Sequence, residues 1–481
     1  MTVQEGIELP GPALSRLSQD QSARLYESCL RLLERTGVRL FHQKAVDLLH
    51  RAGAKVEDGN RVRIPARLVE WAVSVAPKQI TLFDQRGKRA MALHGQRSYF
   101  GPGSDCLHII DHRTGTRRTP ILRDVIEGVS LCDSLENIDF VMSMFLPSDV
   151  NQRAADRSQM EVMLSHTSKP IVFVSFDASG CVDAVRMAEI VRGGSSALQE
   201  KPSIVCYINV TTGLRHNEEA LQKLIFLADK AIPACYIPGA MAGAAAPVTV
   251  AGSTVVRMAG ALAGALIAQL TREGAPVLVP GWGALALNMR TTVMSYAGPD
   301  HQGVTQALGH YLGLPLFSNG GSSDSKLVDQ QAGIEAALTL MINAVAGSHV
   351  VHDVGYLESG LSCSLAQMVM CDEIIAWIKR CLAPVDLSDE SLGLELIDRV
   401  GPDGQFLDND HTLRHFREQW HPPLFDRDGY DRWSAKDGKS LAEKAAQKVD
   451  VLLGKHLAPD LPADIVAELQ QIVRQAEETA K

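Results

Sequence analysis

The stretch LFSNGGSSDSKLVDQQAGIEAALTLMINAVAGSHVVHDVG, residues 316–355, decides the fold. A short apolar run at Leu316–Gly320 leads through a loop rich in Gly and Ser into a helical pattern at Asp329–Ala346. A second apolar run follows at His349–Gly355. Because short apolar runs bounded by glycines are typical of buried strands, this stretch predicts one strand–helix–strand unit with parallel strands.

The same unit recurs along the chain at intervals of about 30–40 residues, the length of a strand, a helix and two loops. The other six apolar runs are Tyr99–Gly101, Phe140–Phe145, Ile171–Phe176, Ile204–Asn209, Ala234–Gly239 and Val277–Gly281. Eight strand–helix units predict an α/β fold of the closed (β/α)8 type, the TIM barrel. Such barrels carry their chemistry at the C-terminal ends of the strands, so the fold limits where functional residues are sought.

A barrel of this type needs about 250 residues, and the chain has 481. We therefore predict an N-terminal helical cap over residues 1–98, the barrel over residues 99–384 and a C-terminal extension over residues 385–481. In the extension, helical patterns near Leu441–Leu453 and Pro462–Glu478 predict two helices packed on the barrel.

Composition excludes several classes of function. The net charge is −9 and charges of both signs are interspersed, which disfavours nucleic acid and anionic membrane surfaces as partners. The first 20 residues contain Glu5 and Glu8 and no apolar core, so they do not predict a signal peptide. The apolar stretch Ala240–Leu270 contains Arg257 and many small residues, and it favours a barrel helix over a membrane span. Nine cysteines without a CxxC motif predict reduced thiols and a cytoplasmic location.

Aromatic residues make up only 5% of the chain, so those at strand ends are informative. Tyr99, Trp282, Tyr296 and Tyr356 lie at or near the predicted rim, and His352 lies towards the C-terminal end of the last strand. Together they predict a box that holds a quaternary ammonium group by cation–π attraction. The alternative interpretation is that each ring is a packed lid residue. His349, near the N-terminal end of the same strand, is predicted to be structural.

Charged residues in the same loops suggest anchors for a polar substrate. Arg290 and Lys326 are candidates to pair with a substrate carboxylate. Asp105, Asp324 and Glu358 either complement a fixed positive charge or cap the helices that follow them.

Other kinds of site find little support. His352, Cys363 and Cys371 do not have a recognised zinc spacing, so no metal site is predicted. Walker loops and serine nucleophile elbows are missing from the sequence, and Gly281-Trp282-Gly283 lacks the third glycine of a dinucleotide loop. No tightly bound cofactor is expected.

The sequence resembles the trimethylamine methyltransferase superfamily over nearly its whole length. The stretches that carry the resemblance are PGAMAGAAAPVT (238–249), NMRT (288–291) with SY (295–296), SDSKLVDQQAG (323–333), GYLESG (355–360), and the C-terminal segments 392–400, 406–407 and 411–413.

The resemblance implies a TIM-barrel methyltransferase that moves a methyl group from an amine to the cobalt of a corrinoid, cob(I)alamin, carried by a separate small protein. Founding members contain pyrrolysine and use trimethylamine. This sequence contains no such residue, so it is similar to the non-pyrrolysine branch, whose substrates are quaternary amines such as glycine betaine, proline betaine and carnitine. We expect the protein to form a homo-oligomer.

Two other interpretations stay open. One is a lyase or hydrolase on the same barrel, which would use His352 with Asp353 or Glu358 as its acid–base set. The other is a betaine-binding protein without catalytic activity.

Overall fold

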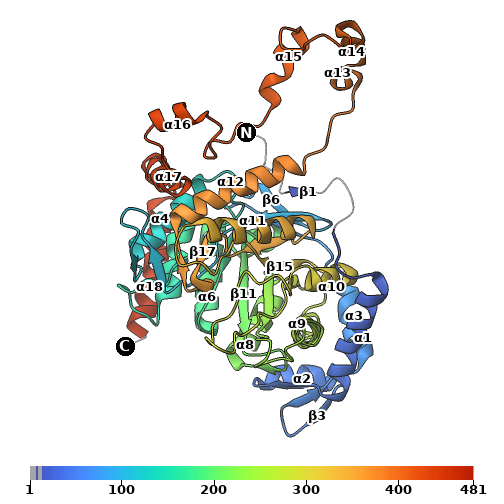
Figure 1. The fold of residues 1–481 in the computed structure, drawn as a ribbon. Helices are drawn as coiled ribbons and strands as arrows, with labels where there is room; N and C mark the ends of the chain where they lie inside the picture. Colours follow the sequence, from blue (N-terminus) through green and yellow to red (C-terminus); the bar gives the residue numbers. More distant parts are fainter. Residues whose placement is uncertain (1–6, 9–13, 480–481) are drawn as a thin grey trace.

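Seven parallel strands form the central sheet in a computed structural model that describes residues 7–8 and 14–479 (Figure 1). Their order in the sheet is β7-β16-β15-β14-β13-β11-β10. The strands are β7 (Arg97–Phe100), β10 (Ile171–Phe173), β11 (Ile204–Val210), β13 (Ala234–Pro238), β14 (Val277–Pro280), β15 (Leu316–Asn319) and β16 (Val350–His352). The predicted α/β barrel fold is confirmed, with seven of the eight predicted runs as strands.

The one predicted strand that is not regular is Phe140–Phe145. It still bridges β7 and β10, because Val172 N donates to the Val141 carbonyl at 2.9 Å and Asp139 N donates to the Phe100 carbonyl at 2.7 Å. Met144 has a φ of 61°, in the left-handed region, and this turn prevents continuous extended backbone. The apolar run was therefore recognised correctly, but its backbone hydrogen bonds are irregular.

In the described residues, eight helices alternate with the barrel strands, as the repeated strand–helix pattern of the sequence predicted. They are α4 (Leu122–Ser134), α5 (Ala155–His166), α6 (Ala178–Arg192), α8 (Glu218–Lys230), α9 (Val250–Thr271), α10 (Val304–Leu312), α11 (Gln330–Val345) and α12 (Leu365–Cys381), and a short α7 (Ser195–Glu200) follows α6. Among the described residues, α9 alone is long and apolar enough to cross a membrane, and most of it is buried inside the protein.

The N-terminal end of the barrel is closed by a hairpin of β5 (Ile80–Phe83) and β6 (Arg89–Leu93). Its apolar side chains belong to one buried cluster with side chains of the barrel strands, among them Val172, Val205 and Val350. Any ligand site must therefore lie towards the other end of the barrel, which we call the barrel mouth.

The rest of the N-terminal region packs around the barrel, and its first strand pairs antiparallel with β7. It contains β1 (Ile7–Glu8), α1 (Gln19–Arg35), β2 (Val38–Leu40), α2 (Gln43–Arg51), β3 (Lys55–Glu57), β4 (Arg61–Arg63) and α3 (Ala66–Val75). Helices α1, α2 and α3 all contact α9, and β2 pairs with β12 (Arg215–His216). Residues 1–6 and 9–13, most of the segment considered as a signal peptide, lie outside the described residues.

A small sheet stands beside the barrel mouth. It is built from β17 (Tyr356–Leu357), β18 (Ser362–Cys363), β8 (His108–Ile110) and β9 (Arg117–Arg118), with a short 3-10 helix (Glu358–Gly360) between β17 and β18. The sheet joins the loop after β16 to the loop after β7.

The C-terminal region leaves the barrel and returns to it. Its elements are α13 (Asp389–Leu392), α14 (Leu394–Val400), α15 (Asp410–His415), a 3-10 helix (Phe416–Glu418), α16 (Tyr430–Ala435), α17 (Leu441–Lys455) and α18 (Ala463–Thr479). Helices α13–α15 form an arm that projects away from the barrel (Figure 1). The last two helices return to it, since α17 packs on α12 and α4, and α18 packs on α5 and α6. The division of the chain at residues 98 and 384 stays a prediction.

Candidate active site

Four rings from different strands meet in the interior at the barrel mouth. The Phe317 ring stacks on the His352 ring with centroids 4.3 Å apart, and Tyr207 lies 4.9 Å from Phe317 and 5.4 Å from His352. Trp282, two residues beyond β14, lies 5.3 Å from His352. Three strands separate β11 from β16 in the sheet, so these rings touch across the barrel. We call Tyr207, Trp282, Phe317 and His352 the aromatic cluster.

Solvent reaches this depth of the barrel. Tyr207 keeps accessible surface although its ring contacts the opposite wall, and Asn209, two residues further along the same strand face, is exposed. Because residues two apart on a strand share a face, the exposed Asn209 shows that the barrel mouth is open beside β11.

The orientation of His352 is fixed by hydrogen bonding. Its Nδ1 donates to the Ser318 carbonyl at 2.6 Å, so Nε2 points at Asp353, whose Oδ2 lies 3.4 Å away. Burial raises the pKa of the Asp353 carboxyl above its ordinary value, with His352 acting in the opposite direction. The protonation state of the Asp353 carboxyl therefore depends on how well the barrel mouth is solvated and on the charge of His352.

A buried arginine covers the other side of the cluster. The Arg257 guanidinium extends from α9 and lies over the Trp282 ring, with Cζ 4.1 Å from the ring centroid. Its Nη1 donates to the Gly283 carbonyl at 3.1 Å, whereas its buried Nε has no hydrogen-bond partner. Burial lowers the pKa of Arg257 to about 10, which still leaves it charged at neutral pH.

Two predicted site residues act through their neighbours. Asp324 Oδ1 accepts from Tyr296 N at 2.9 Å, and Asp324 Oδ2 accepts from Ser295 Oγ at 3.1 Å. Asp324 therefore fixes the loop that carries Tyr296, whose side chain packs against the cluster. Tyr356 is buried near Asp353, and its hydroxyl donates to the Ser104 carbonyl at 2.6 Å.

Asp105 lies on the loop after β7, next to the barrel mouth. Its Oδ1 accepts from Gln159 Nε2 at 3.0 Å, and burial raises the pKa of its carboxyl. Its backbone has a φ of 62°. The structure thus brings Asp105 to the edge of the site, held by Gln159.

Four candidates lie elsewhere. The Tyr99 hydroxyl accepts from Ala92 N at 2.9 Å, so its side chain packs on the hairpin that closes the opposite end of the barrel. Arg290 and Lys326 are exposed on loops. Glu358 forms a bidentate ion pair with Arg117, with distances of 2.8 and 3.0 Å. These residues do not join the aromatic cluster. Tyr99 packs against the hairpin, Arg290 and Lys326 extend into solvent, and Glu358 is paired with Arg117.

His349 has the structural role that was predicted for it. Its Nδ1 accepts from Leu316 N at 2.9 Å, and its Nε2 donates to the Gly95 carbonyl at 3.1 Å. Burial lowers its pKa to about 3, so the ring is neutral and links two strands to the closing hairpin.

Sequence reasoning missed Tyr207, Phe317 and Arg257. The alternation of side chains along a strand could have identified the two rings. Tyr207 lies two residues before Asn209 and Phe317 two residues before Asn319, so each ring shares a strand face with a polar residue at the strand end. Arg257 was visible as the one charge in a long apolar stretch, which marks a buried cation.

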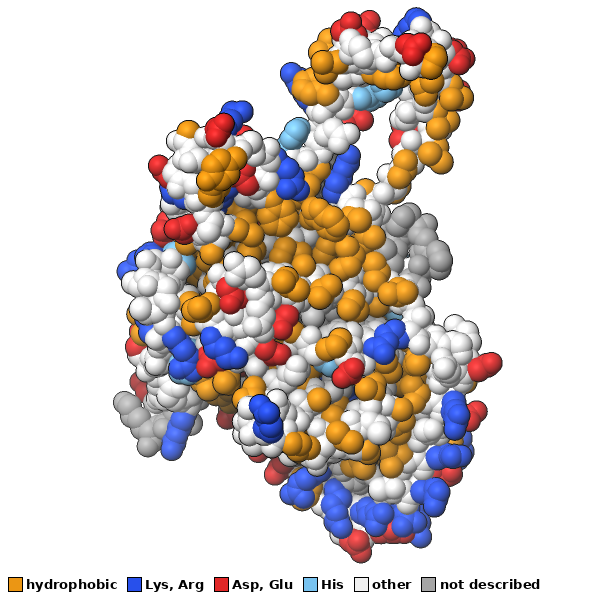
Figure 2. All heavy atoms as spheres, in the orientation of Figure 1, with side chains coloured by type: hydrophobic (Ala, Val, Ile, Leu, Met, Phe, Trp, Pro, Cys, Tyr) orange, Lys and Arg blue, Asp and Glu red, His pale blue; other side chains and the backbone are white. Residues whose placement is uncertain are grey.

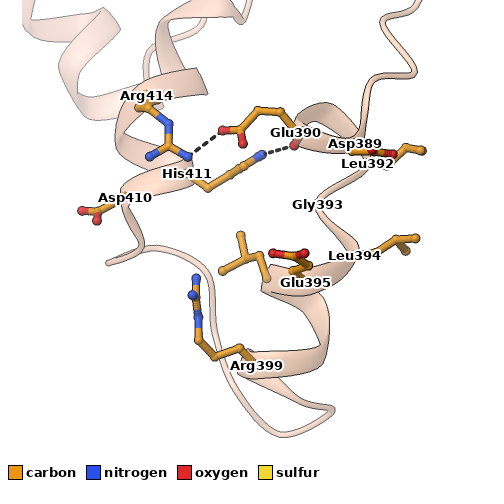
Figure 3. Close-up of a pocket in the computed structure, with 11 residues that line it drawn as sticks. Asp389, Glu390, Leu392, Gly393, Leu394, Glu395, Arg399, Asp410, His411 and Arg414 are labelled. Carbon is orange, nitrogen blue, oxygen red and sulfur yellow. Dashed lines mark hydrogen bonds and ion pairs between the residues drawn. The ribbon is translucent and has the colours of Figure 1, made fainter.

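Nucleophilic and metal sites are not evident in residues 7–8 and 14–479. In this part of the chain no serine or cysteine side chain hydrogen-bonds a histidine ring. The one cluster with metal-ligand geometry in the same residues is Glu390, His411 and His415 on the arm. Figure 3 shows that Arg414 and His411 both point at Glu390, and Arg414 Nη2 donates to its carboxylate at 2.6 Å. An existing ion pair therefore occupies that carboxylate.

The fold and the position of the site define an α/β-barrel enzyme with its site at the C-terminal ends of the strands. The family model for trimethylamine methyltransferase (MTTB) matches residues 2–480. The chain belongs to this family and is a methyltransferase.

Named relatives agree with this assignment. The chain is 31% identical to trimethylamine methyltransferase MttB of Desulfitobacterium hafniense strain DSM 10664 / DCB-2, covering 99% of this chain and 97% of the relative. It is 29% identical to the glycine betaine methyltransferase of D. hafniense strain Y51, covering 96% and 97%. The crystal structure of the Methanosarcina barkeri monomethylamine methyltransferase (MtmB) shares the fold, with a TM-score of 0.53, 12% identity, and coverage of 94% of this chain and 91% of that one.

Proposed function

We propose that the protein transfers a methyl group from a quaternary amine, glycine betaine or a related betaine, to the Co(I) of a corrinoid carried by a partner protein. The observation that carries this proposal is the aromatic cluster that meets across the barrel interior. Apolar and aromatic rings attract a quaternary ammonium by cation–π interaction and contact, without needing a hydrogen-bond acceptor. The names of the two relatives, a trimethylamine and a glycine betaine methyltransferase, support a methylated amine as substrate.

The chemistry makes few demands on side chains. The N–CH3 bond breaks with its electron pair left on nitrogen, so the product is a neutral tertiary amine that needs no proton. The cobalt supplies the electron pair for the new Co–CH3 bond and passes from Co(I) to Co(III). The protein has to hold one methyl group in line and exclude water. An aromatic chamber without a serine or cysteine nucleophile, as far as residues 14–479 go, suits that task.

The loops around the barrel mouth suit a protein partner. Val248 and Met289 are each 66% exposed, and Val293 is 47% exposed. They lie on the loops that follow β13 and β14, which pair through the bridge between Ala242 and Ala286. We assign this apolar edge to the corrinoid protein, and Arg290 to its border rather than to the substrate.

Homo-oligomer formation is a further part of this proposal. Figure 2 shows hydrophobic side chains gathered over α11 and α12. Ile334 and Leu338 of α11 are each 59% exposed, and Trp377 of α12 is 40% exposed. An exposed apolar face of this kind is typical of a subunit interface.

Binding of the quaternary amine is expected to strengthen as the pH rises through the raised pKa of Asp353. The ionised carboxylate attracts the ammonium, whereas the protonated form, which prevails below that pKa, does not. The neighbouring Tyr207, Tyr296 and Tyr356 are neutral over this range, since burial raises their pKa values. Calorimetric titrations across pH should show this rise in the wild type and a flat profile in Asp353→Asn. A pH-dependent profile retained by the variant would contradict the role of Asp353.

The second candidate function is a lyase or hydrolase that uses the His352–Asp353 pair, whose 3.4 Å separation is the observation in its favour. The two functions differ in their need for a corrinoid. We expect the purified protein to consume no glycine betaine, proline betaine or carnitine when corrinoid is omitted, measured by mass spectrometry under anoxic conditions. Turnover without corrinoid would support the His352 chemistry instead.

A further inference from the structure

Arg257 is a buried charge without an acidic partner. Its side chain is 4% exposed, it makes one hydrogen bond, and its Nε is unsatisfied. In the described part of the chain, no aspartate or glutamate contributes to its electrostatic surroundings. An isolated buried charge is costly, and proteins normally pair it or neutralise it. Arg257 therefore lacks an anionic partner of its own.

The groups around Arg257 do not supply that anion. Tyr207 and Tyr296 are the ionisable groups that act on it, and burial raises the pKa of both phenols, so both are neutral. Burial lowers the pKa of His301 to about 4, with the charge of Arg257 acting in the same direction, so this ring is neutral as well. Among the described residues, the ionisable groups that act on the guanidinium are therefore uncharged.

The position of Arg257 links it to the aromatic cluster. Its Cζ lies 4.1 Å from the Trp282 centroid, and the His352 centroid lies 5.3 Å from that same indole. The guanidinium carbon therefore lies at most about 9 Å from the His352 centroid, the sum of these two distances, so a ligand that touches both is small. Its negative and positive groups must be close together.

We propose that Arg257 binds the carboxylate of the substrate, and that the substrate is an α-betaine, in which a single carbon separates the carboxylate from the quaternary nitrogen. This proposal rests on the proposed function, because it uses the aromatic cluster as the ammonium site. The guanidinium offers planar, charged N–H donors to a carboxylate, as expected for charge-assisted recognition. Trimethylamine, which lacks a carboxylate, leaves the buried charge unpaired. γ-Butyrobetaine separates its carboxylate from the ammonium by three carbons instead of one.

The test is equilibrium binding to the purified full chain without corrinoid, measured by calorimetry. The probes are glycine betaine, γ-butyrobetaine and tetramethylammonium, which has the cation alone. Wild type is expected to bind glycine betaine most tightly. Arg257→Met is expected to weaken glycine betaine binding by at least about 30-fold, because a buried carboxylate loses its charged partner. The same variant should bind tetramethylammonium as well as wild type does, which also shows that the site is folded.

Two further variants sharpen the result. Arg257→Lys keeps the charge but loses the planar fork, so an intermediate loss of about 10-fold is expected. Arg272→Met removes an exposed arginine just past the other end of α9 and should leave every affinity unchanged. The proposal is overturned if Arg257→Met retains glycine betaine, if it loses both ligands equally, or if only Arg290→Met loses glycine betaine.

Failure of this inference can be told apart from failure of the proposed function. If wild type binds glycine betaine through Arg257 but does not methylate cob(I)alamin, the carboxylate site stands and the methyl transfer is rejected. If wild type methylates cob(I)alamin while Arg257→Met keeps the same KM for glycine betaine, the methyl transfer stands and the role of Arg257 is rejected.

Discussion

Replacing Trp282 with alanine is expected to raise KM for the quaternary amine by at least about 30-fold. The indole lies 5.3 Å from the His352 ring and 4.1 Å from the Arg257 guanidinium carbon, so it contributes to the proposed cation site and also supports the arginine. A cation–π contact in a desolvated site contributes about 2 kcal/mol, which is about 30-fold, and displacement of Arg257 adds to this loss. The rate with saturating substrate should fall less than the affinity.

Steady-state kinetics with glycine betaine and cob(I)alamin measure this effect. Trp433→Ala is the matched control, since Trp433 lies on α16, outside the barrel, and this change should leave KM unchanged. A thermal melt of each variant accounts for lost packing, because truncating a buried tryptophan costs about 3–5 kcal/mol of stability. If Trp282→Ala and Tyr207→Ala both bind glycine betaine with unchanged affinity, the aromatic site is wrong.

Gly103→Ala is expected to reduce kcat/KM by about 100-fold, although Gly103 itself is not a proposed substrate contact. A Cβ at this position would overlap Asp353 Oδ1 and would lie 2.5 Å from the Tyr356 ring and hydroxyl. Tyr356 cannot retreat, because it is buried and its hydroxyl donates to Ser104. The added methyl group therefore displaces Asp353 and its neighbour His352, and a displacement of about 1 Å at a site can cost that much rate.

Kinetics and denaturant unfolding together test this second expectation. Overpacking should also lower the free energy of unfolding by about 1–3 kcal/mol. Gly454→Ala on α17 is the control, since a Cβ there meets no atom within 4 Å. Unchanged kcat/KM in Gly103→Ala would show that Asp353 and His352 tolerate displacement.

The fold could be predicted from the sequence because its signal is periodic. Each buried strand is an apolar run, and each run alternates with a helix whose ends are marked. At Asp329, for example, the side chain accepts from Ala332 N at 2.9 Å and begins α11. The exception is Phe140–Phe145, where the backbone of Met144 is left-handed. Methionine does not favour this conformation as glycine does, so the sequence does not predict it.

The site could be predicted only in part. Trp282 and His352 were found because they lie at strand ends. Glu358 was misleading, because its partner Arg117 comes from a hairpin 241 residues earlier in the chain, and local sequence does not report such a distant ion pair. Arg257 was overlooked for the opposite reason: it lies on a helix, away from the loops where strand-end reasoning searches, and reaches the site only through tertiary packing.

Methyl transfer is measured most directly by the anoxic absorbance spectrum of cob(I)alamin mixed with the protein and a betaine. We expect cob(I)alamin to decay to methylcob(III)alamin only when both the protein and the betaine are present, with an equimolar amount of the demethylated amine formed. Glycine betaine and proline betaine should support the reaction better than carnitine, γ-butyrobetaine or trimethylamine. An unchanged cobalt spectrum with every one of these amines, or methylation supported by trimethylamine alone, would contradict it.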